Sequence, residues 1–177
     1  EVLGIDADHE AIEVSKSRLS AYQERFTFVN DNFKNIKKIA MKQNFIPPHG
    51  ILFDLGVSSL QLNIESRGFS FKRKSPLDMR FSFDQKLTAD QVINTFNENE
   101  IADILYNLGE ERKARQIAKI IVNNRPIKYA DELAELIKKN IRNTNYKINP
   151  ATKTFQALRI YINEELSNLL IGDIKKN

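Results

Sequence analysis

Three short apolar runs alternate with helical patterns in the first third of the chain, and this order limits the fold more than any other feature. The runs are residues 2–5, which end at Asp6, residues 26–29, which end near Asp31, and residues 51–53, which end at Asp54. They show little alternation of polar and apolar residues, as is typical of parallel strands covered on both faces. The β-α-β-α-β order predicts a doubly wound parallel sheet.

Two helical patterns connect these runs. The first places apolar residues on one face between residues 11 and 22, and Asp8 stands where its side chain can cap the helix N-terminus. The second covers residues 33–40 and is ended by the prolines at positions 47 and 48.

The rest of the chain is expected to be helical. Three apolar stripes with helical spacing follow one another between about residues 88 and 143, and Thr88 and Gln91 have the spacing of a capping box. A last helix is expected to begin with Asn149 as its cap and Pro150 in its first turn.

These patterns divide the chain into three parts. We predict a sheet core over residues 1–64, a helical insertion over residues 65–148, and a helix over residues 149–177 that returns to the core and extends through Leu166.

The composition excludes several classes of site. The chain has no Cys, so it has no disulfide, thiol nucleophile or Cys-based zinc site, and His9 and His49 lack the spacing of metal ligands. We therefore assign no metal. No apolar run is long enough to cross a membrane and no leader opens the chain, so we expect a cytoplasmic protein with no membrane partner. The net charge of +4 is compatible with a polyanionic partner.

Six blocks of sequence occur in order along the chain: GIDAD, FDLGVSSLQL, RGFSF, SPLDMR, LGEERKARQIA and ATKTFQALRIYINEEL. Together they resemble the ribosomal RNA small subunit methyltransferase H family. The resemblance implies a Rossmann-like methyltransferase sheet, an inserted all-helical domain and S-adenosyl-L-methionine as cofactor. It implies a cytidine exocyclic amine in the decoding region as target, so the partner is small-subunit ribosomal RNA or the assembling small ribosomal subunit.

The same resemblance implies that this sheet is partial. The family's first strand, with a glycine-rich turn for the cofactor, would precede Glu1, and its last strand would follow Asn177. We therefore expect these 177 residues alone to be inactive.

Four positions match cofactor-binding residues of the family: Asp6, Phe33, Asp54 and Gln61. From the residues alone, Asp6 suits ribose hydroxyls and equally suits a structural turn at the strand end. Asp54 is a candidate for orienting the attacking amine, although cofactor binding alone is the favoured role.

A basic loop rich in Phe follows Asp54. Its aromatic residues Phe69, Phe71 and Phe81 are expected to hold it to the body of the protein. Its cations are expected to face the RNA backbone: Arg67, Lys72, Arg73, Lys74 and Arg80. Asp78 is expected to pair with Arg80 or Arg67. The alternative is a solvated charged loop.

Two readings other than an enzyme stay open, a non-catalytic RNA-binding module and a ribosome-assembly module. Four matched cofactor positions favour the enzyme, because a binding module has no use for them. The sequence leaves the oligomeric state open.

Overall fold

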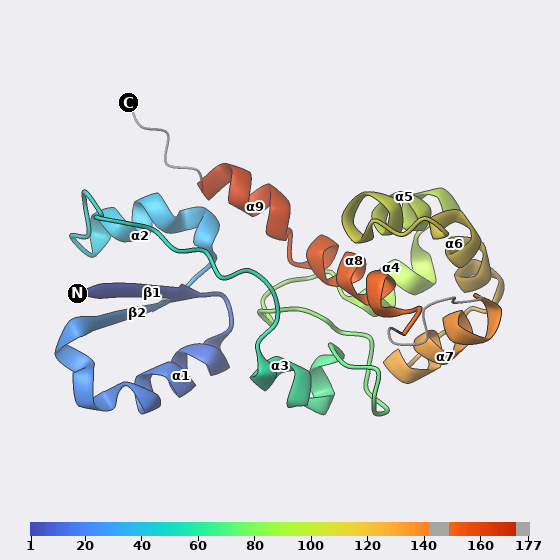
Figure 1. The fold of residues 1–177 in the computed structure, drawn as a ribbon, viewed down its shortest axis with the longest axis horizontal. Helices are drawn as coiled ribbons and strands as arrows, with labels where there is room; N and C mark the ends of the chain where they lie inside the picture. The colour runs from blue at the N-terminus through green and yellow to red at the C-terminus, as the bar shows by residue number, and fades with distance from the viewer. Residues whose placement is uncertain (142–148, 173–177) are drawn as a thin grey trace. The chain divides into compact units, whose positions relative to one another are not determined.

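The computed structural model describes residues 1–141 and 149–172, which form two compact units (Figure 1). One unit comprises Glu1–Gly56 with Glu164–Asn177, and the other comprises Val57–Asn163. No helix in the described ranges is long and apolar enough to cross a membrane. Within the same ranges, no three His, Cys, Asp or Glu side chains gather as metal ligands.

The first unit is built on two parallel strands. Strand β1 (Val2–Asp6) pairs with β2 (Phe26–Asn30) so that Asp6 stands opposite Asn30. Helix α1 (His9–Arg18) and the 3-10 helix η1 (Ser20–Arg25) connect them (Figure 1). The predicted cap of α1 is confirmed, because the Asp8 carboxylate accepts a hydrogen bond of 3.0 Å from the backbone N–H of Glu10.

A short 3-10 turn and two helices complete this unit. The 3-10 helix η2 (Phe33–Asn35) follows β2 and leads into α2 (Ile36–Lys42), which buries Ile39 and Ala40. Helix α9 (Glu165–Gly172), from the far end of the chain, packs against η2. The predicted single helix over residues 33–40 therefore begins as a 3-10 turn.

The predicted third strand over residues 51–53 is wrong for this structure. The described sheet contains β1 and β2 alone, and residues 51–55 have no regular secondary structure. Leu52 is 91% exposed. A strand needs a neighbouring strand to take its backbone hydrogen bonds, and no described segment forms a ladder with these residues.

The second unit is helical. Its elements are α3 (Ser59–Asn63), the 3-10 helix η3 (Glu65–Arg67), α4 (Ala89–Thr95), α5 (Glu98–Gly109), α6 (Ala114–Asn123), α7 (Ala130–Asn140) and α8 (Thr152–Ile162). The predicted stripes are confirmed as core, since Ile101, Ile117 and Ile137 are fully buried. The predicted capping box of Thr88 and Gln91 begins α4.

The predicted domain boundaries need correction. The compact units divide after Gly56 and after Asn163, whereas the predicted end at residue 148 lies outside the described residues. Helix α8 belongs to the helical unit because it packs closely on α5: a Cβ at Gly109 would lie 2.6 Å from the Lys153 carbonyl oxygen. The helix expected to continue through Leu166 is interrupted at Glu164, which has a φ of 51°.

Candidate cofactor site and basic loop

Asp6 ends strand β1 and is held there by backbone contacts. Its Oδ1 accepts a hydrogen bond of 2.8 Å from the backbone N–H of Asp8, and its backbone carbonyl oxygen accepts one of 2.9 Å from the side-chain amide of Asn30. Partial burial raises the pKa of the Asp6 carboxyl, against the lowering effect of the Asp8 N–H. The side chain is nevertheless exposed by its accessible area, so this shift carries little free energy.

Phe33 and Asp54 line one hollow of about 800 Å³ in the sheet unit. The Phe33 ring meets the Phe53 ring edge to face, with 6.0 Å between centroids. Asp54 is exposed at this hollow, which is also lined by Ile5, the residue before Asp6. The structure therefore brings Phe33 and Asp54 together and places Asp6 next in the chain to the lining.

Gln61 lies in the helical unit and caps helix α3. Its Oε1 accepts a hydrogen bond of 2.9 Å from the N–H of Ser58, and its own N–H donates to the Ser58 hydroxyl at 3.2 Å. The side chain is buried. Its carbonyl oxygen thus serves a capping box, which the Ser58 to Gln61 spacing signals in the sequence as clearly as Thr88 to Gln91 does.

The Phe residues of the basic loop hold it to the helical unit, as predicted. Phe71 meets Phe155 of α8 at 4.8 Å between ring centroids, and Phe69 meets Phe81 at 5.6 Å. Phe69 is buried.

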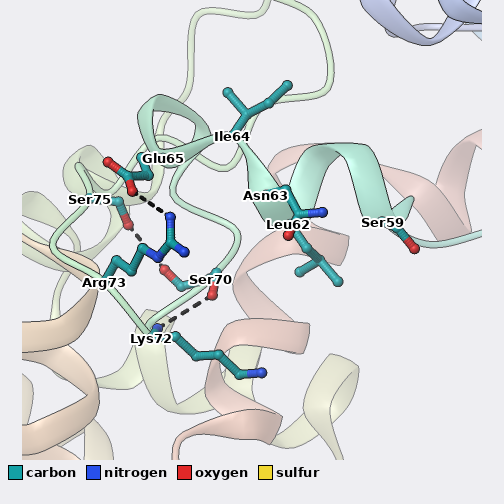
Figure 2. Close-up of a pocket in the computed structure, with 9 residues that line it drawn as sticks. All are labelled: Ser59, Leu62, Asn63, Ile64, Glu65, Ser70, Lys72, Arg73 and Ser75. Atoms are coloured by element: carbon teal, nitrogen blue, oxygen red, sulfur yellow. Dashed lines mark hydrogen bonds and ion pairs between the residues drawn. The ribbon is translucent and has the colours of Figure 1, made fainter.

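Three cations of this loop remain exposed. Arg73 donates a hydrogen bond of 2.8 Å from Nη1 to Glu65 Oε1 (Figure 2). The Lys74 ammonium lies 4.1 Å from the centre of the Tyr129 ring. Lys72 is exposed and makes no ion pair with another residue of the described ranges.

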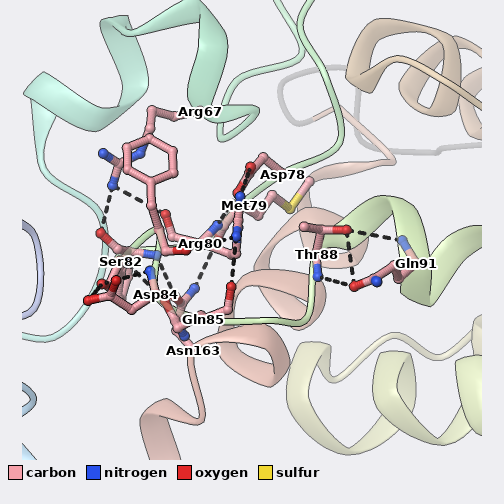
Figure 3. A network of polar contacts seen from close by, with 12 residues as sticks. Arg67, Asp78, Met79, Arg80, Ser82, Asp84, Gln85, Thr88, Gln91 and Asn163 are labelled. Atoms are coloured by element: carbon pink, nitrogen blue, oxygen red, sulfur yellow. Dashed lines mark hydrogen bonds and ion pairs between the residues drawn. The ribbon is translucent and has the colours of Figure 1, made fainter.

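Arg67 and Arg80 have a structural role. Arg67 is 2% exposed, and its Nη2 donates hydrogen bonds to the carbonyl oxygens of Arg80 and Phe81 at 3.2 and 2.8 Å (Figure 3). Arg80 pairs with Asp78 and also donates to the carbonyl oxygens of Phe83 and Gln85. The expectation that both guanidinium groups face RNA is therefore corrected, while the predicted pair of Asp78 and Arg80 is confirmed.

Residues 1–171 match the sequence model of the MraW methylase family. The chain belongs to this family. The match confirms the resemblance inferred from the six sequence blocks, and the family implies a Rossmann-like methyltransferase fold.

Two curated relatives are similar to this chain over most of its length. A protein of Dehalococcoides mccartyi is 47% identical over 169 residues, which cover 96% of this chain and 48% of the relative. A protein of Mycoplasma mycoides is 46% identical over 164 residues, which cover 92% of this chain and 53% of the relative. Both are named ribosomal RNA small subunit methyltransferase H. The chain spans about half the length of these curated relatives.

Proposed function

We propose that this chain contributes to a methyltransferase that uses S-adenosyl-L-methionine to methylate a cytidine of small-subunit ribosomal RNA. The observation that carries the proposal is the family match over residues 1–171, together with relatives that are 46–47% identical and bear that enzyme's name. The target is the exocyclic amine of a cytidine in the decoding region, and the site of action is the cytoplasm.

Residues of the sheet unit fit part of a nucleoside site. The Oδ2 atom of Asp6 makes no hydrogen bond with the described residues. This oxygen is the one that accepts a hydrogen bond from a ribose hydroxyl of the cofactor. Phe33 is half-buried, so part of its ring is open to an adenine. When bound, S-adenosyl-L-methionine supplies a methyl group on a positively charged sulfur.

Asp54 has two roles open to it at the same hollow. The first is binding of the cofactor's polar groups. The second is orientation of the target amine, whose lone pair is delocalised into the cytosine ring; a carboxylate that accepts one of its N–H groups helps the nitrogen to rehybridise. We assign cofactor binding to Asp54 as its first role and orientation of the target amine as an additional one. An Asp54 variant that slows methyl transfer without weakening cofactor binding would show the additional role.

A chimera tests the proposed function. The 169 matching residues of the Dehalococcoides mccartyi relative are replaced by this chain, and nucleosides of small-subunit RNA treated with the chimera are analysed by mass spectrometry. We expect a methylated cytidine at the position that the parent relative modifies. A folded chimera that transfers no methyl group, beside an active parent, means that this chain is a binding or assembly module.

A further inference from the structure

A second hollow lies within the helical unit, between helix α3 and the basic loop. It has a volume of about 490 Å³. Figure 2 shows that α3 carries Ser59, Leu62 and Asn63 on one side, while the loop carries Ser70, Lys72, Arg73 and Ser75 on the other. Ile64 and Glu65 join the two walls. The volume lies within the range of about 300–1,000 Å³ that is common for ligand pockets.

The polar groups of this hollow fall into two sets. Ser70 and Ser75 shape the loop, since the Ser75 hydroxyl donates to the Ser70 carbonyl oxygen at 3.0 Å and the Ser70 hydroxyl accepts from the N–H of Lys72 at 3.3 Å. The Ser59 hydroxyl, the Asn63 amide and the Lys72 ammonium are exposed and make no side-chain hydrogen bond with other described residues. The second set is therefore available to a ligand.

The charges of the hollow favour an anion. Lys72 and Arg73 outnumber the single carboxylate of Glu65. Glu65 Oε1 takes one of the five N–H donors of the Arg73 guanidinium, and this pair is exposed, with 74% of the Arg73 side chain accessible. An exposed pair of this kind is weak, so an incoming anion can share or replace the carboxylate.

We propose that this hollow binds the ribose–phosphate backbone of RNA. The proposal rests on the proposed function for the identity of the polymer. A phosphate lies against Lys72 and Arg73, and the ribose 2′-hydroxyl bonds to the side-chain amide of Asn63. No aromatic ring lines the hollow, so it offers no stacking platform for a base. The 2′-hydroxyl distinguishes RNA from DNA, and the hollow therefore contributes recognition of the RNA backbone without selecting a base.

The test measures binding of the 177-residue chain to a short single-stranded RNA, and to DNA of the same sequence, at several salt concentrations. Lys72→Ala is expected to weaken RNA binding about tenfold, as loss of a charged hydrogen bond does. It is also expected to reduce the slope of affinity against salt by about one. Glu65→Gln is expected to strengthen binding, because it removes the carboxylate that competes with phosphate. Asn63→Ala is expected to reduce the preference for RNA over DNA while leaving the salt slope unchanged.

Two matched variants control for general effects. Lys138→Ala, on α7, changes the net charge as Lys72→Ala does but lies outside the hollow, and Asn107→Ala, on α5, truncates another exposed amide. Equal weakening by Lys72→Ala and Lys138→Ala overturns the proposal, and so does an unchanged RNA preference in Asn63→Ala. If the chimera methylates RNA but none of these variants changes RNA binding, the proposed function stands and the hollow is not an RNA-binding site. If the variants change RNA binding as expected but the chimera is inactive, the hollow binds RNA and the proposed function is wrong.

Discussion

The carboxylate of Asp78 holds the guanidinium of Arg80 through two parallel hydrogen bonds. The distance from Arg80 Nε to Asp78 Oδ1 is 2.9 Å and that from Nη2 to Oδ2 is 2.8 Å (Figure 3). Both side chains are less than one-fifth exposed, at 18% and 16%. The hydrogen bonds from Asp78 raise the pKa of the Arg80 guanidinium.

Replacing Asp78 is therefore expected to destabilise the helical unit. Asp78→Ala removes the two bonds to the guanidinium and a third, in which Asp78 Oδ1 accepts from the backbone N–H of Arg80. We expect the free energy of unfolding to fall by about 1–3 kcal/mol, because a largely buried charge loses its partner. Urea denaturation followed by circular dichroism measures it. Glu135→Ala breaks the exposed pair with Lys138 and should hardly change the midpoint; equal losses from the two variants contradict the assignment.

Gly68 lies at a turn of the basic loop, where its backbone closely approaches Pro76 and Asp78. Its φ is +72°, and a Cβ there would collide with the carbonyl oxygen of Pro76 and lie 2.9 Å from the N–H nitrogen of Asp78. We expect Gly68→Ala to lower the free energy of unfolding by at least about 1–3 kcal/mol from backbone strain alone. Gly50→Ala is the control, because nothing lies within 4 Å of a Cβ at that position. A thermal midpoint for Gly68→Ala equal to that of Gly50→Ala would show that the loop relaxes without cost.

Local signals were predictable from the sequence, and contacts distant in sequence were not. The caps at Asp8 and Thr88 depend on residues two or three positions away, so their sequence spacing identifies them. Residues 51–53 have the composition of a strand, but a strand exists only beside a partner, and composition does not show whether one is in place. The composition of the basic loop likewise predicted that Arg67 and Arg80 face RNA, whereas both donate hydrogen bonds to carbonyl oxygens of the protein.

The candidate site was also predictable only where it depends on local sequence signals. Asp6 ends the first observed strand and Phe33 comes shortly after the second, so the sheet pattern predicted their positions. The burial of Arg67 depends on carbonyl oxygens 13 and 14 residues further along the chain, and no spacing rule predicts such a contact. The hollow beside α3 was not predicted, because residues 59–65 and residues 70–75 line it together only in the folded loop.

Asp6 provides a test of cofactor binding that includes pH. In the chimera, Asp6→Ala is expected to weaken binding of S-adenosyl-L-methionine by about 1–3 kcal/mol, because ribose hydroxyls lose their acceptor. Burial raises the pKa of this carboxyl above its ordinary 3.8. As the pH falls, the carboxylate therefore protonates earlier than a free Asp, and affinity is lost from a higher pH. Calorimetry over a pH series should show this loss in the unaltered chimera and not in Asp6→Ala; equal affinity of the two at neutral pH removes Asp6 from the ribose site.

The sheet of the 177-residue chain by itself has unpaired edges. Both described strands are edge strands, and Val2, Leu3 and Ile5 of β1 line a hollow that residues 51–55 also line. Open edges and apolar walls of this kind are the places where a further strand pairs and packs. We therefore expect the chain alone to bind S-adenosyl-L-methionine weakly and to transfer no methyl group, whereas the chimera does both.

The two units should also differ in stability when separated. Val57–Asn163 contains a contiguous core with buried Ile101, Ile117 and Leu158, so it should unfold cooperatively on its own, whereas Glu1–Gly56 should not. Calorimetric titration with the cofactor, a methyl-transfer assay on small-subunit ribosomal RNA and urea melts of each unit check these statements. Turnover by the 177-residue chain above background would mean that two strands and the hollow beside them already make a working cofactor site, with no further strand required.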